Sequence, residues 1–176
     1  MTKKKYIGQL VSIKYIDRST AISGFVIDYN DEWTLLKYNP VDYVIDGYII
    51  LRHKNIEGFR RDAREKFREK VIILKKQHLP DISDFPLTDL DTILSSLTKK
   101  YGIFQFDLKT EKACYLGKLK SLTKGKLTID YLNPKGLWTK RMEFRPGDIR
   151  TIEFDTDYIN SLKLVSKKNH PKTSIQ

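Results

Sequence analysis

A stretch that reads Trp33-Thr34-Leu35-Leu36-Lys37-Tyr38-Asn39-Pro40 returns later in the chain as Leu127-Thr128-Ile129-Asp130-Tyr131-Leu132-Asn133-Pro134. The match continues upstream and, after a one-residue gap, downstream, in the pairs Gly24 and Gly117, Arg52 and Arg145, Ile56 and Ile149, and Asp62 and Asp155. A self-match of this length indicates one folding unit used twice, so the repeat decides the architecture before any single strand does.

Length and composition agree with two small domains. The chain has 176 residues, of which 40% are apolar and 31% charged, and two domains of roughly 80 residues fit that length. No run approaches the roughly 18 consecutive apolar residues that span a bilayer. The basic start, Met1–Lys5, has no apolar stretch behind it, so we expect no secretory signal and a cytoplasmic location.

The charge balance favours polyanionic partners. The formal net charge is +11; residues 1–87 carry 16 basic and 12 acidic side chains, and residues 88–176 carry 17 and 10. A positive field of this kind raises the encounter rate with nucleic acids, although many basic proteins bind none.

Hydrophobic alternation predicts five short strands in each half. Period-two patterns, turn residues and an internal glycine place the first set at 11–15, 22–29, 33–38, 48–52 and 56–59. The second set follows the same order at 104–108, 115–122, 127–132, 142–145 and 151–154. Five short strands joined by tight turns are typical of a small, strongly bent barrel.

Three helices are predicted beside the strands. One follows Asp62 with an apolar stripe, although 71–74 also fits a strand; the stripe is Ala63, Phe67, Val71, Leu74 and His78. The second follows the capping pattern of Thr88 and Asp91 and places these residues on one face: Leu90, Ile93, Leu94, Leu97 and Tyr101. The third begins near Asp155–Tyr158.

The expected organisation has four parts. Residues 1–80 form a first barrel with a trailing helix, and residues 81–87 form a linker. Residues 88–165 form a leading helix, a second barrel and a C-terminal helix, and residues 166–176 form a flexible tail.

The order of strands and turns resembles the Sm-like (LSm) family of five-stranded, SH3-like barrels. Its first motif combines a strand glycine, apolar positions, a turn and an apolar residue followed by Asn; the matching residues are Gly24, Val26, Tyr29, Asn30 and Trp33–Leu35, and then Gly117, Leu119, Leu122 and Leu127–Ile129. Its second motif is an apolar strand that ends in Arg-Gly, matched by Leu51–Ile56 and Phe144–Ile149. The resemblance implies a mainly β fold of two tandem barrels joined by a helical linker.

Two departures bear on RNA recognition by such a fold. In RNA-binding members the Asn of the first motif contacts a base, and here Thr34 and Thr128 stand in its place. A hydroxyl cannot offer the bidentate pairing of an amide. The Arg-Gly of the second motif is replaced by Arg52-His53 and Arg145-Pro146. We therefore do not expect base-specific binding through the family's usual pocket.

The candidate binding residues are cations and aromatics. Arg52 and Arg145 hold the same place in both halves, where a guanidinium stacks on a base or holds a phosphate; alternatively, each closes an internal ion pair. Aromatic rings interleaved with lysines are typical of single-strand binding, but small barrels also use such rings in the core and rim. The nucleic-acid-binding candidates are Arg52, Lys54, Tyr38, Tyr48, Arg145, Lys135, Lys140 and Arg141.

Other residues favour structural roles. Asn39-Pro40 and Asn133-Pro134 are expected to close Asx turns. Cys114 is the only cysteine, which excludes an internal disulfide, and we expect a buried, inert thiol. His53, His78 and His170 lie far apart without metal-ligand spacing.

The sequence predicts no enzyme, no catalytic residue, no metal and no cofactor. The leading hypothesis is a non-enzymatic binding or regulatory module that binds RNA or another single-stranded polyanion through a basic, aromatic rim. The alternative is a protein-interaction scaffold that assembles, with itself or with other proteins, through barrel edge strands. Neither hypothesis involves a membrane.

Overall fold

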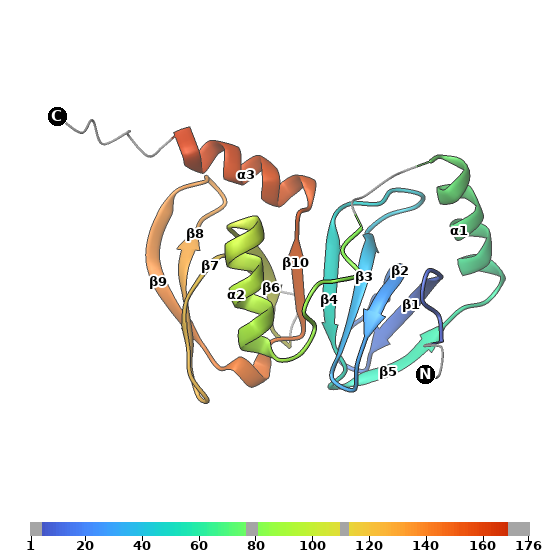
Figure 1. The fold of residues 1–176 in the computed structure, drawn as a ribbon, viewed down its shortest axis with the longest axis horizontal. Coiled ribbons are helices and arrows are strands. Elements are labelled where there is room, and N and C mark those ends of the chain that lie inside the picture. The colour runs from blue at the N-terminus through green and yellow to red at the C-terminus, as the bar shows by residue number, and fades with distance from the viewer. Residues whose placement is uncertain (1–4, 77–80, 110–112, 169–176) are drawn as a thin grey trace.

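The structure, a computed structural model, describes residues 5–76, 81–109 and 113–168 (Figure 1). Ten strands form one antiparallel sheet in the order β5-β1-β2-β3-β4-β10-β6-β7-β8-β9. Three α-helices accompany the sheet within these ranges. The mainly β fold with flanking helices confirms the predicted fold class in outline.

The elements follow the predicted order. The first half contains β1 (Leu10–Tyr15), β2 (Ile22–Tyr29), β3 (Trp33–Asn39), β4 (Tyr48–Arg52), β5 (Ile56–Arg60) and α1 (Ala63–Leu74). The second half contains α2 (Leu90–Tyr101), β6 (Phe104–Asp107), β7 (Cys114–Leu122), β8 (Leu127–Leu132), β9 (Trp138–Phe144), a 3-10 turn (Pro146–Asp148), β10 (Thr151–Phe154) and α3 (Asp157–Lys168). The largest difference is that β9 begins at Trp138 rather than near residue 142.

The two halves carry the same pairing register. Gly24 lies opposite Tyr38, and Gly117 lies opposite Tyr131, so counterparts are 93 positions apart. A Cβ on Gly24 would lie 2.4 Å from the carbonyl oxygen of the residue before its tyrosine, and a Cβ on Gly117 would lie 2.2 Å from the corresponding oxygen. Both glycines are required because the neighbouring strand approaches too closely for a side chain.

The register corrects one part of the sequence alignment. Thr34 lies opposite Tyr29, and Leu127 lies opposite Leu122 at the end of the matching strand pair. The counterpart of Thr34 is therefore Leu127 and not Thr128. The duplicated Asn-Pro pairs are displaced by the same single position, because adjacent β positions face opposite sides and the sheet fixes which residues are equivalent.

The halves are joined through their edge strands, and the sheet remains open. β4 pairs with β10, and the Tyr48 ring stacks on Phe154 with centroids 5.1 Å apart. β5 and β9 are the two outer strands of the sheet, so the described residues show no closure of either half into a barrel. Figure 1 shows β4 and β10 side by side between the two halves.

Two hydrophobic clusters account for most of the core. The smaller of these two lies within the first half and contains Val11, Ile13, Leu36 and Ile49. The larger fills the second half and extends across the junction to Trp33 and other residues on the opposite face of β3 and β4. Ile82, Phe85 and Leu87, from the expected linker, are buried in this larger cluster. That segment therefore packs the halves together, because its apolar side chains are removed from water between them.

The helices form as predicted, but α1 turns a different face inward. Residues 71–74 are helical. Phe67 and Leu74, expected on the buried stripe, are 59% and 70% exposed. Glu65 and Ile72 are buried instead. The Glu65 carboxylate accepts a hydrogen bond from the Ser12 hydroxyl at 2.7 Å, so polar contacts decide which face of α1 meets the sheet.

In α2 the expected apolar face is buried: Ile93, Leu94 and Leu97 are fully enclosed. No helix in the described part of the chain is both long enough and apolar enough to cross a membrane. The end of the predicted first domain at 77–80, including His78, and most of the predicted tail, at 169–176, lie outside the described residues.

Candidate functional site

The predicted binding residues do not form one continuous rim. Arg52, at the end of β4, forms an ion pair with Glu32 at 2.5 Å and donates a hydrogen bond to the Pro146 carbonyl at 3.0 Å. Its guanidinium also lies 5.1 Å from the centre of the Trp33 ring. These contacts tie Arg52 to the junction between the halves, as the ion-pair alternative predicts.

Arg145 does not repeat this arrangement. It is exposed where β9 ends. The counterpart of Glu32 is Gly125, which offers no carboxylate. Lys54, in the turn after β4, and Lys135, in the turn after β8, are also exposed. The shared position of the two arginines therefore does not give them a shared partner.

The two predicted tyrosines are withdrawn from the surface to different degrees. Tyr48 is fully buried against Phe154, so its ring cannot serve as a platform for a base and the prediction for it is wrong. Tyr38 is half-buried, and burial followed by the carboxylates of Glu153 and Asp107 raises its pKa to about 12. Both rings stabilise the protein interior at or near the junction.

Both duplicated asparagines hold turns, but only Asn133 forms the predicted Asx turn, in which the side-chain oxygen accepts a backbone N–H two residues on. The Asn39 side-chain amide donates to the carbonyl groups of Val41, Asp42 and Val44 at 3.2, 3.0 and 2.7 Å. The Asn133 side-chain oxygen accepts the backbone N–H of residues 135 and 137 at 2.9 and 3.1 Å. The Asn39 side-chain nitrogen and the Asn133 side-chain oxygen are therefore used within the protein.

A basic hollow on the second half brings several predicted residues together. Its volume is about 270 Å³, and it is lined by Lys118, Asp130, Tyr131, Trp138, Thr139, Lys140 and Arg141. We call this set the basic hollow. It forms because β7, β8 and β9 are neighbours, which places Lys118 opposite Asp130, and Asp130 opposite Arg141. Cross-strand neighbours of this kind lie within side-chain reach.

Cations and rings are interleaved within the basic hollow. The Lys118 ammonium lies 5.0 Å from the centre of the Trp138 ring. Arg141 forms an ion pair with Asp130 at 3.4 Å, although its side chain remains 65% exposed. Lys140 is exposed with no ion-pair partner recorded in the described residues. One carboxylate against three cations leaves the hollow with a net positive charge.

Sequence reasoning found only part of the basic hollow. It selected Lys140 and Arg141, but it missed Lys118. The sequence did contain a signal for Lys118, because this residue directly follows the duplicated Gly117. Gly117 lies opposite Tyr131, so Lys118 lies opposite the neighbouring residue, Asp130. This position could be recognised only once the pairing of β7 with β8 was known.

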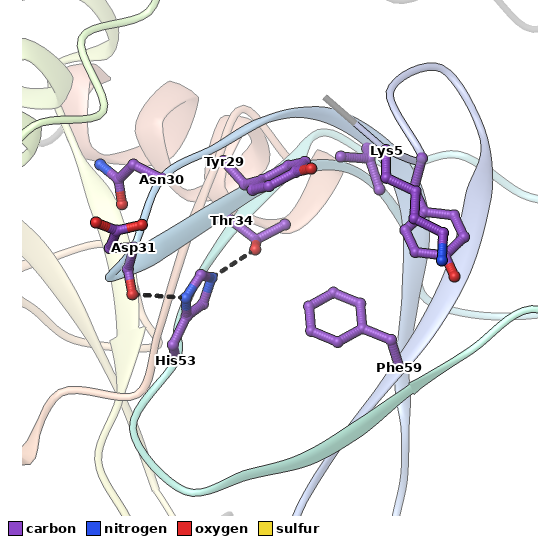
Figure 2. Close-up of a pocket in the computed structure, with 9 residues that line it drawn as sticks. Lys5, Tyr29, Asn30, Asp31, Thr34, His53 and Phe59 are labelled. Atoms are coloured by element: carbon purple, nitrogen blue, oxygen red, sulfur yellow. Dashed lines mark hydrogen bonds between the residues drawn. The ribbon is translucent and has the colours of Figure 1, made fainter. Parts of the chain in front are cut away.

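A second cavity, of about 460 Å³, opens on the first half and is mainly apolar (Figure 2). We call it the first-half pocket; its lining residues are Lys5, Tyr6, Val26, Tyr29, Asn30, Asp31, Thr34, His53 and Phe59. Figure 2 shows the Phe59 ring across from the Thr34 and His53 side chains, with Tyr29 above them. Apolar walls with a few polar groups are typical of binding sites.

The polar groups at one side of this pocket are already paired. His53 Nδ1 lies 3.0 Å from the Asp31 carbonyl oxygen, and Nε2 lies 2.7 Å from the Thr34 hydroxyl. A carbonyl only accepts, so Nδ1 carries the proton and Nε2 accepts from Thr34. His53 therefore links the β4–β5 turn to β3 and to the turn before it.

The described residues contain no group of three or more His, Cys, Asp or Glu side chains arranged to hold a metal. His170 lies outside them. Cys114 is exposed at the start of β7, so the expectation of a buried thiol is wrong. Partial desolvation and then the carboxylates of Asp107 and Glu153 raise the pKa of its thiol, which disfavours the reactive thiolate.

Comparisons with protein-family models, curated proteins and solved structures find no match for this chain.

Proposed function

We propose that this chain is a non-enzymatic module that binds single-stranded nucleic acid, RNA in particular, through the basic hollow. The observation that carries the proposal is the placement of Trp138 and Tyr131 beside Lys118, Lys140 and Arg141. Rings stack on bases of any sequence, and the cations neutralise the phosphates between them. Asn39, Asn133 and Arg52 already make contacts within the protein. We therefore do not propose base-specific recognition through these residues.

The proposed binding is weak and depends on salt. Three phosphate contacts, one for each cation of the hollow, give a slope of about −2 in a plot of log affinity against log salt, at about −0.7 for each phosphate of a single strand. The test is a fluorescence-anisotropy titration of a short, labelled RNA of mixed sequence at several salt concentrations. Absence of binding at low salt, or binding indifferent to salt, would refute the proposal.

Matched variants locate the binding surface. Lys140→Ala should weaken binding and reduce the salt slope by about 0.7, whereas Lys66→Ala, an exposed lysine on α1, should change neither. Trp138→Ala should weaken binding by about fivefold to a hundredfold, because stacking is worth about 1–3 kcal/mol per base, and Trp138→Phe should retain most of it. Equal effects of Lys140→Ala and Lys66→Ala would show that only the overall charge matters.

We also propose that each half is a unit of the Sm-like type, although the sheet is open at both edges. The common strand order, in which the fifth strand of each half lies beside the first, supports a duplicated unit of this kind. So does the shared bulge, which follows Val26 in β2 and Leu119 in β7. Bulges at matching positions increase the bend of both halves in the same place.

The alternative is assembly through edge strands, and pairing of this kind is supported only between the two halves of one chain. The β4–β10 junction places Tyr48 opposite Phe154. If copies of the chain paired β9 with β5 in the same register, the counterparts of these residues would be Arg141 and Arg61, the residue just after β5, and they would face each other. Like charges directly opposite are destabilising, and charged edges protect a sheet from such pairing. We therefore propose a monomer, which light scattering would show at 20.7 kDa; larger rings would contradict it.

A further inference from the structure

The first-half pocket has a counterpart in the second half that is not open. The constant spacing between equivalent positions relates four of its lining residues to four residues in the second half. Val26, Tyr29, Thr34 and Phe59 correspond in this way to Leu119, Leu122, Leu127 and Ile152. Phe59 is 47% exposed, whereas Ile152 is fully buried. The position of Ile152 is therefore covered by other parts of the protein, whereas the equivalent position of Phe59 is not.

In the second half, α2 packs against β6 and β7, and β10 is flanked on its other side by β4. Ile93, Leu94 and Leu97 are fully buried in the same cluster as Leu127 and Ile152. A hydrogen bond also holds α2 on β7, because the Leu119 backbone N–H donates to the Thr98 hydroxyl at 3.0 Å. Figure 1 shows α2 lying across the strands of the second half, whereas no helix of the described residues lies in the corresponding place on the first.

In the first half, the segment before β1 takes another course. Ile7 forms a parallel bridge with Val26, and the Gly8 N–H donates to the Val26 carbonyl at 2.8 Å. Tyr6 and Gly8 have φ values of 70° and 76°. A right-handed helix requires negative φ values, so this segment is not helical at these residues. The described part of this segment runs along the rim of the pocket and leaves Phe59 uncovered.

We propose that the first-half pocket docks an amphipathic helix of a partner protein, in the way that α2 docks on the second half. The helix would present Leu or Ile side chains at the spacing of Leu90, Ile93, Leu94 and Leu97. Insertion of such an apolar stripe into a hydrophobic groove is a recurring mode of recognition.

The chemistry of the pocket favours a helix over a nucleic acid. Among the described residues, Lys5 is the one lysine or arginine that lines it, and Asp31 lines it as well. His53 already uses both ring nitrogens for contacts within the protein. A polyanion would therefore find little neutralising charge, whereas an apolar stripe would meet Val26, Tyr29 and Phe59. The pocket and the basic hollow lie on different halves, so one protein could hold both partners.

The probe for this proposal is a labelled peptide of residues 88–102, which contains α2, added to the full chain and followed by fluorescence anisotropy. We expect binding with a Kd of about 10–100 μM, as suits a small apolar contact. Phe59→Ala should weaken binding about tenfold or more, because it removes buried apolar area, and Phe59→Leu should retain it. Phe67→Ala removes another exposed ring, on α1 and outside the pocket, and should have no effect.

Three results would overturn the proposal. The first is failure of the peptide to bind, or binding that persists in a peptide carrying both Ile93→Asp and Leu97→Asp. The second is displacement of the peptide by mixed-sequence RNA in the wild type and in Lys140→Ala alike, which would assign the pocket to nucleic acid. The third is self-association of the chain that Phe59→Ala abolishes, which would make a second copy the occupant.

Discussion

Glu153→Gln is expected to stabilise the protein above neutral pH. Glu153 lies on β10 at the junction, opposite Ile49 of β4 and Gln105 of β6. Burial, and then the carboxylates of Asp107 and Asp46, raise its pKa from 4.5 to about 7. The folded protein therefore keeps a proton on this carboxyl group at pH values where the unfolded chain has released it.

The magnitude follows from the two pKa values. The stability contributed by the protonated carboxyl group is fully present below pH 4.5 and is lost as the pH rises through about 7. A tenfold change in acidity is worth about 1.4 kcal/mol, so the loss at pH 8 approaches about 3 kcal/mol, or roughly 1–2 kcal/mol after allowance for solvent screening. Glutamine resembles the protonated acid in shape and charge and does not titrate.

The assay is urea unfolding at pH 5 and at pH 8. Glu153→Gln should exceed the wild type by about 1–2 kcal/mol at pH 8 and by roughly a quarter of that near pH 5. Glu57→Gln is the control, because Glu57 is an exposed carboxylate on β5 paired with Lys14 at 2.9 Å. Equal stabilities of Glu153→Gln and wild type at pH 8, or the same gain at both pH values, would refute the reasoning.

Three further substitutions test the fold. Gly117→Ala should lower the free energy of unfolding by about 1–3 kcal/mol, because the added Cβ would lie 2.2 Å from a carbonyl oxygen, whereas Gly58→Ala, with open space around it, should change little in urea titrations. Burial opposes ionisation of Glu65, but hydrogen bonds from the Ser12 hydroxyl, the Asp62 backbone N–H and the Arg60 guanidinium outweigh it and hold its pKa at about 2. Its contribution is therefore present above pH 4.5 and lost as the pH falls towards 2, so Glu65→Gln should flatten the acid limb of the stability curve measured by circular dichroism. Tyr48→Ala should cost about 3–5 kcal/mol in calorimetry through loss of the stack across the junction, and a cost below about 1 kcal/mol would show that the junction contributes little.

Much of the local structure could be read from the residues alone. Alternation with period two located the strands, since it reflects which side chains face the core. The apolar face of α2 located that helix, because it depends on neighbours within a few positions. The predicted cap was one residue off, since Asp89 and not Thr88 is the N-cap and accepts the Thr92 N–H. The face of α1 could not be predicted in this way. A buried carboxylate, Glu65, replaces an apolar contact there, and the partner that ties it to the sheet, Ser12, lies 53 positions away in the sequence.

The candidate site shows the same division. Lys140 and Arg141 were predicted because they are adjacent cations near a tryptophan in the sequence. Lys118 was missed, since its nearness to Trp138 depends on the pairing of strands across the second half. Tyr48 was assigned to the surface because an aromatic residue in a short strand fits either side of a sheet.

The sequence by itself determined that one unit is used twice and which segments become strands and helices, because repetition and periodicity are properties of neighbouring residues. The tertiary structure decided that β4 pairs with β10, that the segment 81–87 is buried, and that α2 covers one half and leaves the other open. These outcomes depend on which apolar surfaces come together in space, and burial of such surfaces is not directional, so no local pattern specifies its partner.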